Sequence, residues 1–291
     1  VKNSIRNNVI IVSVSKVKRQ NSDVEIAYEL SGEGYPLAFV HGLGAGRTQT
    51  TTSLTSLRDT MLIAPDMLGH GDSISGDAAL VAAMSFNQCA DDVIAILDHL
   101  GIEKSNIGGL SMGSGVALNI ALRYPQRVNK LILLRPSWMC QPRPAHLALV
   151  AYIGKWLEAG GTEVAEQELL SHSDYIALLA EVPKVAESIR GLLKRPDYFS
   201  HTSVLYKMWE DAPFSSLGDL SRVTQEALVL YTTRDNLHPI SVAECIAIAL
   251  PKLQGMQELP PRYDQPEEYT AALNEVLNAF LSAITSHHLE E

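Results

Sequence analysis

Short apolar runs alternate with amphipathic helical stretches over the first 136 residues, and this alternation constrains the fold more than any other feature. Apolar runs at 36–40, 61–64 and 128–134 are typical of strands that are buried on both faces of a sheet. A helix is predicted between Ser85, a capping residue, and Gly101. Strands that alternate with helices in this way predict an α/β fold with a mostly parallel, doubly wound sheet and helices on both faces.

The alternation stops after residue 136, and a long stretch with mostly helical periods follows. The strand pattern returns only at residues 227–231, and Pro266 opens a final helix. We therefore predict three parts: a core made of residues 1–136 and 221–285, a helical lid of residues 137–220 between the sixth and seventh strands, and a tail of residues 286–291.

The chain has 33 acidic and 23 basic residues and a formal net charge of −10. This balance disfavours nucleic acid as a partner, because phosphate binding needs a clustered basic surface. The one dense basic run, residues 16–19, is predicted to be a solvated turn. A chain of 291 residues with 46% hydrophobic residues is long enough to form a large core without a structural metal or disulfide. We expect no cofactor and no metal.

Three cysteines, an odd number spread along the chain, favour reduced thiols and a cytoplasmic location. We find no apolar run of the 18 residues that a membrane span requires, so no membrane partner is expected. The apolar residues 9–12 are too few for the core of a signal peptide, and we expect them to form an early strand.

Residues 109–113 read Gly-Leu-Ser-Met-Gly and match the pattern G-x-S-x-G between a predicted strand and a predicted helix. In that setting the serine lies on a sharp turn, because the flanking glycines remove side chains that would collide with the neighbouring backbone. Its hydroxyl then projects over the carboxyl ends of the strands, above the positive end of the helix. Ser111 is therefore the candidate nucleophile, and a small-residue turn without chemistry is the simpler alternative.

A second loop, His41-Gly42-Leu43-Gly44, directly follows the apolar run at 36–40. A glycine-rich loop at this place supplies a backbone amide to an oxyanion hole. We assign one donor to Leu43 and the other to Met112, the residue after the nucleophile. For the ring of His41 we expect only a packing role.

Three segments together, 40–44, 64–73 and 109–136, resemble the α/β-hydrolase superfamily, in the branch of small esterases, lactonases and carbon–carbon bond hydrolases. The resemblance extends over most of residues 24–136 and again over 226–283, but not over the lid. It implies that Asp66 and the Gly-His-Gly at 69–71 shape a loop beside the site, so that His70 is structural.

The family pattern also places an aspartate after the seventh strand, and Asp235-Asn236-Leu237-His238-Pro239 fits this pattern. Asp235 is the candidate for the carboxylate that orients a catalytic histidine. The alternative for Asp235 is a capping or turn residue.

The chain departs from the family where the catalytic histidine is expected, after the eighth strand. Residues 257–266 contain no histidine, and His287 and His288 lie beyond the last helix. Serine is a weak nucleophile without a base, so His238 is the provisional base, with a surface histidine as the alternative. The lid histidines His146, His172 and His201 have no motif support. Slow or absent hydrolysis, with a pocket that only binds a ligand, and differently based chemistry on a reactive substrate also stay open.

Two further residues are candidates for substrate binding. Arg135 ends the sixth strand at the expected catalytic edge of the sheet, where a guanidinium binds a substrate carboxylate in a two-pronged fashion or pairs with a nearby aspartate. Trp138 opens the lid and lines the pocket or packs in the core.

The reading that follows is a serine hydrolase that acts on a small ester, lactone or related acyl compound. The alternatives are a pseudo-hydrolase that binds a ligand and a non-hydrolytic biosynthetic enzyme, such as a lyase or cyclase, on the same scaffold. The expected partner is a small-molecule substrate, and the oligomeric state is open, a homodimer being one option.

Overall fold

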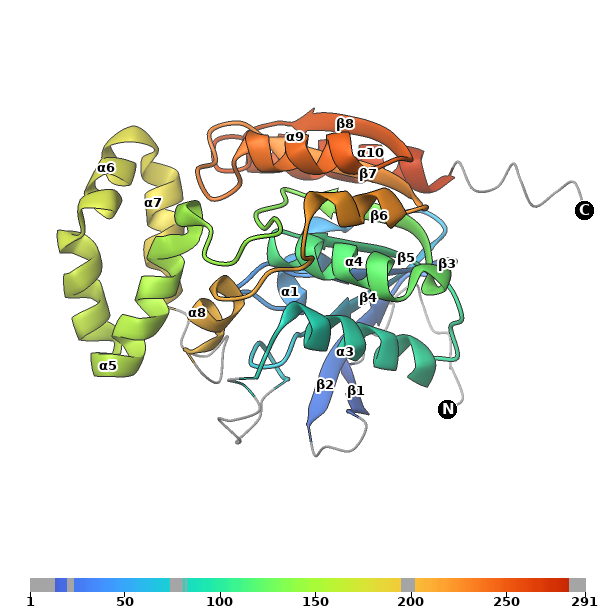
Figure 1. Ribbon diagram of the computed structural model, residues 1–291, viewed down its shortest axis with the longest axis horizontal. Helices are drawn as coiled ribbons and strands as arrows, with labels where there is room; N and C mark the ends of the chain where they lie inside the picture. Colours follow the sequence, from blue (N-terminus) through green and yellow to red (C-terminus); the bar gives the residue numbers. More distant parts are fainter. Residues whose placement is uncertain (1–13, 20–23, 74–80, 82, 195–201, 283–291) are drawn as a thin grey trace, which may run out of the picture.

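The computed structural model describes residues 14–19, 24–73, 81, 83–194 and 202–282 (Figure 1). Its centre is one eight-stranded sheet in the order β1-β2-β4-β3-β5-β6-β7-β8. The strands are β1 (Val14–Lys18), β2 (Glu25–Ser31), β3 (Tyr35–Val40), β4 (Thr60–Pro65), β5 (Ser105–Leu110), β6 (Val128–Leu134), β7 (Glu226–Thr232) and β8 (Leu253–Leu259). Strand β2 pairs antiparallel with β1 and with β4, and all other pairs are parallel. The predicted fold class is confirmed.

Alternate residues of the parallel strands enter two separate cores, one on each face of the sheet. Leu37 and Phe39 of β3 lie in one core, with residues of α10 (Pro266–Ser282). Ala38 and Val40 lie in the other, with residues of α3 (Phe86–His99), α4 (Met112–Arg123) and α9 (Ile240–Ala249). The two cores explain why the central strands read as continuous apolar runs.

One expectation at the amino-terminal edge is wrong. Residues 16–18 of the basic run belong to strand β1 and not to a solvated turn. The strand forms because Val17 is buried against the core while Lys16 pairs with Glu25 on the neighbouring strand. Arg19, just after β1, forms an ion pair with the buried Asp92 of α3. The strand expected at residues 9–12 and the tail at 286–291 lie outside the described residues.

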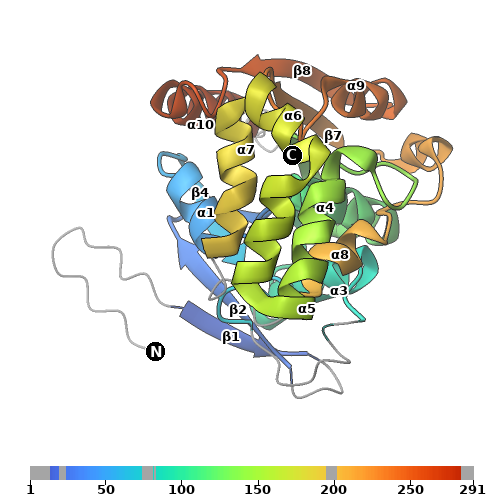
Figure 2. The ribbon, with the colours of Figure 1, turned by 90° about the vertical axis from the view of Figure 1, so that its left-hand side faces the viewer.

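The stretch between β6 and β7 is helical, as predicted. Its helices are α5 (Ala148–Ser171), α6 (Ser173–Glu181), α7 (Pro183–Arg190) and α8 (Val204–Trp209). They stand together beside the sheet, at the left of Figure 1 and toward the viewer in Figure 2. None of the helices in the described part of the chain has the length and apolarity that crossing a bilayer requires.

Candidate active site

Ser111 lies on a strained turn between β5 and α4, with φ +57° and ψ −111°. The turn is possible because of the glycines on both sides. A Cβ atom at Gly109 would lie 2.2 Å from the carbonyl oxygen of Gly113, and one at Gly113 would lie 2.1 Å from the carbonyl oxygen of Val40. Contacts this close exclude any larger residue unless the backbone moves. The G-x-S-x-G pattern therefore follows from the approach of β5, α4 and the end of β3.

The Ser111 side chain faces a cavity of about 100 Å³ between the sheet and the helical insertion. The core contributes Leu43, Ser111, Arg135, His238 and Arg262 to the wall, and the 137–220 insertion contributes Trp138, Leu147, Val150, Ile189 and Leu192. The residues on the insertion side are mostly apolar, whereas the charged groups come from the core. The cavity thus has the character of a small-molecule site with a few polar groups on an apolar wall.

The hydroxyl of Ser111 donates a hydrogen bond to the hydroxyl of Ser137, over 3.3 Å. Ser137 is itself buried and donates to the backbone carbonyl of Leu237, over 2.8 Å. Ser137 thereby links the nucleophile candidate to the loop that carries His238. No sequence motif pointed to Ser137, because it lies in the irregular segment between β6 and the insertion.

The loop after β3 leaves one backbone amide without a partner. The Gly42 amide donates to the Gln49 side chain, the Gly44 amide to the ring of His70, and the Ala45 amide to the carbonyl of Gly42. Within the described residues the Leu43 amide donates no hydrogen bond. The Met112 amide is at the first position of α4, where helix geometry leaves amides without an intrahelical acceptor. These are the two amides assigned to the oxyanion hole, and that assignment stays a prediction.

The rings of His41 and His70 hold this loop in place. His41 accepts a hydrogen bond from the Met67 amide over 3.0 Å, and its ring lies against that of His70. Burial lowers the pKa of His41 and, with the nearby His41, lowers that of His70 to about 3. Asp66 accepts hydrogen bonds from the amide and the guanidinium of Arg47. His41 and His70 thus have the structural roles expected of them.

Asp235 and His238 form a direct pair in the loop between β7 and α9. Nδ1 of His238 lies 2.8 Å from Oδ2 of Asp235, and both side chains are buried. The second oxygen of Asp235 accepts a hydrogen bond from the Leu237 amide over 3.3 Å, so this carboxylate also closes a turn. Since an ionised carboxylate only accepts hydrogen bonds, Nδ1 carries the proton and Nε2 is left with a free lone pair.

The environment keeps this pair in the forms that base catalysis needs. Burial on its own would raise the pKa of the Asp235 carboxyl, but His238 and Arg135 outweigh it and lower that pKa. Burial lowers the pKa of His238 to about 4, against the opposing effect of the Asp235 carboxylate. At neutral pH the pair is therefore an ionised aspartate and a neutral imidazole.

The other histidines considered from the sequence are placed differently. Nε2 of His146 lies 2.9 Å from the carbonyl oxygen of Ser137, behind the site. His172 caps α6 and packs against Tyr152 and Trp156. His201, His287 and His288 lie outside the described residues. Among the described histidines, His238 is the one that lines the cavity with Ser111.

Arg135 combines the two roles considered for it. Its side chain is fully buried, and Nη1 donates to Oδ2 of Asp235 over 2.7 Å, which makes a structural ion pair. Arg135 also lines the cavity. Its backbone has φ +46°, a left-handed conformation that is uncommon for a residue other than glycine.

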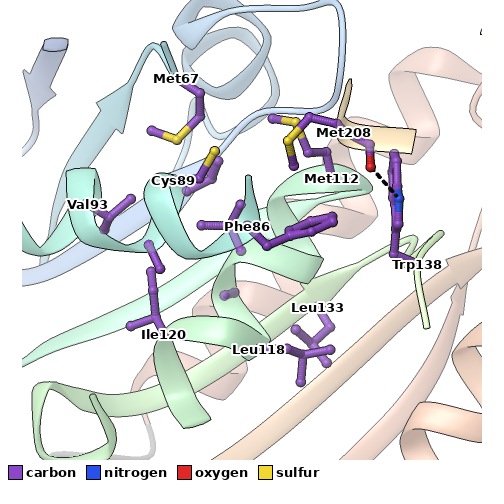
Figure 3. Close-up of a cluster of buried hydrophobic side chains, with 14 of the residues drawn as sticks. Met67, Phe86, Cys89, Val93, Met112, Leu118, Ile120, Leu133, Trp138 and Met208 are labelled. Carbon is purple, nitrogen blue, oxygen red and sulfur yellow. Dashed lines mark hydrogen bonds between the residues drawn. The ribbon is translucent and has the colours of Figure 1, made fainter. Parts of the chain in front are cut away.

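Trp138 also combines both expected roles. It lines the cavity, and its ring packs edge-to-face against Phe86, with centroids 5.7 Å apart. Figure 3 shows the indole at the border of the core, where its nitrogen donates to the backbone carbonyl of Met208 over 3.2 Å. Trp138 thus fixes the first residues of the insertion against the sheet.

Two cavity residues escaped the sequence analysis, Arg262 and Tyr263. Both lie in the loop between β8 and α10, where the family pattern expects the catalytic histidine. The signal was present, since the histidine was seen to be missing, but the residue that lies in its place was not considered. Burial and the nearby Arg135 lower the pKa of Arg262.

Comparison with known proteins agrees with this architecture. A family model described as alpha/beta hydrolase fold matches residues 35–261. The chain is 26% identical over 227 residues to a 2-hydroxymuconate semialdehyde hydrolase from Pseudomonas sp. (strain CF600), and the match covers 75% of this chain and 76% of that one.

Solved structures show the same likeness. A thermophilic esterase from Thermogutta terrifontis superposes with a TM-score of 0.70 at 26% identity, over 92% of this chain and 98% of that one. A meta-cleavage product hydrolase from Pseudomonas fluorescens IP01 has the same fold, with a TM-score of 0.65 at 23% identity, over 90% and 95% of the two chains. Because the family model spans most of the chain, the protein belongs to the α/β-hydrolase fold family and is a hydrolase of that fold.

Proposed function

We propose that Ser111 is the nucleophile of a hydrolase for small esters, lactones or related acyl compounds, with His238 as the base. The observation that carries the proposal is the buried Asp235–His238 pair on the wall of the same cavity as the Ser111 hydroxyl. The printed names of the relatives include an esterase and carbon–carbon bond hydrolases, which supports acyl chemistry of this class.

In the proposed reaction, substrate binding turns the Ser111 hydroxyl from Ser137 toward Nε2 of His238. Ser111 Oγ forms a bond to the carbonyl carbon while its proton passes to Nε2. The amides of Leu43 and Met112 hold the negative oxygen of the tetrahedral intermediate. His238 then gives the proton to the leaving group, and water releases the acyl group from Ser111 in a second, mirrored step. Asp235 keeps the imidazole oriented and stabilises its charged form.

Replacing the two reacting side chains tests the proposal. With p-nitrophenyl butyrate, Ser111→Ala and His238→Asn should each lower kcat by roughly a thousandfold or more, because neither side chain works without the other. His172→Asn removes a histidine away from the cavity and should keep the parent activity. A fluorophosphonate should label Ser111 in the parent protein and not in Ser111→Ala.

One observation favours the ligand-binding alternative: the Ser111 hydroxyl is bonded to Ser137 and not to an imidazole. If the protein only binds its ligand, the parent should show no burst of p-nitrophenol and no fluorophosphonate labelling. Equal turnover in the parent and Ser111→Ala would likewise contradict a role for Ser111 as nucleophile.

A further inference from the structure

Two guanidinium groups lie beside Ser111 in the same cavity. Arg135 reaches the cavity from the end of β6, and Arg262 reaches it from the loop between β8 and α10. The chain therefore has a cation in the segment where the family pattern expects the catalytic histidine. Two like charges on one small cavity repel each other, so this arrangement is costly without an anion nearby.

The hydrogen bonds of Arg135 are incomplete. Its side chain has no exposed surface, and Nη1 is paired with Asp235. Its Nε and Nη2 atoms are buried and have no hydrogen-bond partner within the described residues. A buried donor without an acceptor destabilises the fold, more so on a charged group. The unmet donors of Arg135 thus favour a ligand that accepts hydrogen bonds.

The charges around the cavity do not balance. Arg135 and Arg262 are positive, Asp235 is the one carboxylate in contact with Arg135, and His238 is neutral at pH 7. The site therefore has one positive charge in excess, although the chain as a whole has a net charge of −10. A second, more open groove shares Ser188, Arg262 and Tyr263 with the cavity, which places Arg262 between the cavity and the groove.

We propose that Arg135 and Arg262 form a binding subsite for a carboxylate, so that the preferred substrate is an ester or lactone with one further, negatively charged carboxylate group. A guanidinium suits this ligand because its planar donors match the two oxygens of a carboxylate. The proposal rests on the proposed hydrolysis only for the statement that the ligand is a substrate. Binding of the carboxylate does not depend on it.

A pair of matched ligands tests the subsite without turnover. Butyrate and butyramide have nearly the same shape and differ in charge, and Ser111→Ala protein removes the nucleophile. By isothermal titration calorimetry at pH 7, butyrate should bind at least about tenfold more tightly than butyramide, which corresponds to about 1.4 kcal/mol. Equal Kd values for the two ligands would overturn the proposal, whatever the fate of the hydrolysis assay.

Three substitutions in the Ser111→Ala background identify the groups responsible. Arg262→Gln should weaken butyrate binding about tenfold and leave butyramide binding unchanged, and Arg135→Lys should weaken butyrate binding because it loses the planar donor pair. Arg234→Gln is the control, because it removes an exposed positive charge that pairs with Asp264, two residues from Arg262. Thermal unfolding verifies that each variant is folded. An unchanged butyrate Kd in folded Arg262→Gln, or an equal loss in Arg234→Gln, would contradict a specific subsite.

Discussion

A single oxygen atom, Oδ2 of Asp235, accepts hydrogen bonds from both His238 and Arg135, at 2.8 and 2.7 Å. In a Ser-His-Asp triad the carboxylate stabilises the charged imidazole that forms during the reaction. Here Arg135 competes for that carboxylate, and its own charge further lowers the pKa of His238. The imidazole is therefore a weaker base than one paired with an unshared aspartate.

This arrangement predicts an acid-tolerant activity. His238 must be neutral to accept a proton, and with a pKa of about 4 it becomes protonated only as the pH falls through that value. For the neutral substrate p-nitrophenyl butyrate, kcat/KM should stay constant down to about pH 5 and then fall, whereas an unperturbed histidine would lose activity near pH 6.5. An acid limb centred near pH 6.5 would contradict this assignment.

Arg135→Met should move the acid limb to higher pH, because the positive charge that lowers the pKa of His238 is removed. The readout is the pH profile of kcat/KM with the same neutral ester, which does not need the carboxylate subsite. Arg234→Gln, at an exposed position, should leave the profile in place. A limb that does not move in Arg135→Met would show that Arg135 has no effect on the base.

Among the elements, the turn between β5 and α4 depends most strictly on its residue types. A Cβ atom at Gly113 would lie 2.1 Å from the Val40 carbonyl oxygen and 3.0 Å from that of His41. These are backbone atoms of the segment that continues into the Leu43 loop. A shift at Gly113 therefore moves the nucleophile and an oxyanion donor together.

Gly113→Ala should consequently lower both stability and activity. We expect a loss of about 1–3 kcal/mol in the free energy of unfolding, the usual range for an atom forced into a packed site, measured by urea denaturation. Gly191→Ala is the matched control, since its Cβ meets no atom within 4 Å and its φ of −57° suits alanine. It should be neutral or slightly stabilising. Equal effects of the two substitutions would contradict this account of the turn.

The same turn shows what can be predicted from sequence. Strands β5 and β6 begin and end where their apolar runs predict, because both faces of a central strand are buried and no surface preference competes. Residues 16–18 were misjudged because an edge strand with one wet face reads like a polar turn. Ser137 and Arg262 could not be placed in the site, because irregular loops are positioned by tertiary contacts that leave no periodic pattern.

At the scale of the whole molecule, histidines buried as neutral groups link the fold to pH. His41, His70 and His238 are fully or almost fully buried, and each has a lowered pKa. Below about pH 6.5 the unfolded chain binds protons that these rings do not bind in the folded state. Stability should therefore decrease as the pH falls from about 6.5 toward the folded-state values of about 4 for His238 and about 3 for His70.

Each such ring contributes a slope of up to about 1.4 kcal/mol per pH unit to the free energy of unfolding in that range. Urea denaturation of the parent between pH 7 and 5 should show the decrease. His238→Asn should have a shallower slope, because it removes one of the rings, whereas His172→Asn, which replaces the cap of α6, should keep the parent slope. An unchanged slope in folded His238→Asn would contradict the linkage.

The placement of Asp235 and His238 three residues apart has a consequence for engineering. In the arrangement proposed above, one short loop delivers acid and base as a single module, so residues 260–265 are relieved of any chemical duty. That neighbouring segment becomes an exchangeable cassette: swapping it between homologous scaffolds should retune which compounds are accepted while the reaction itself is inherited intact.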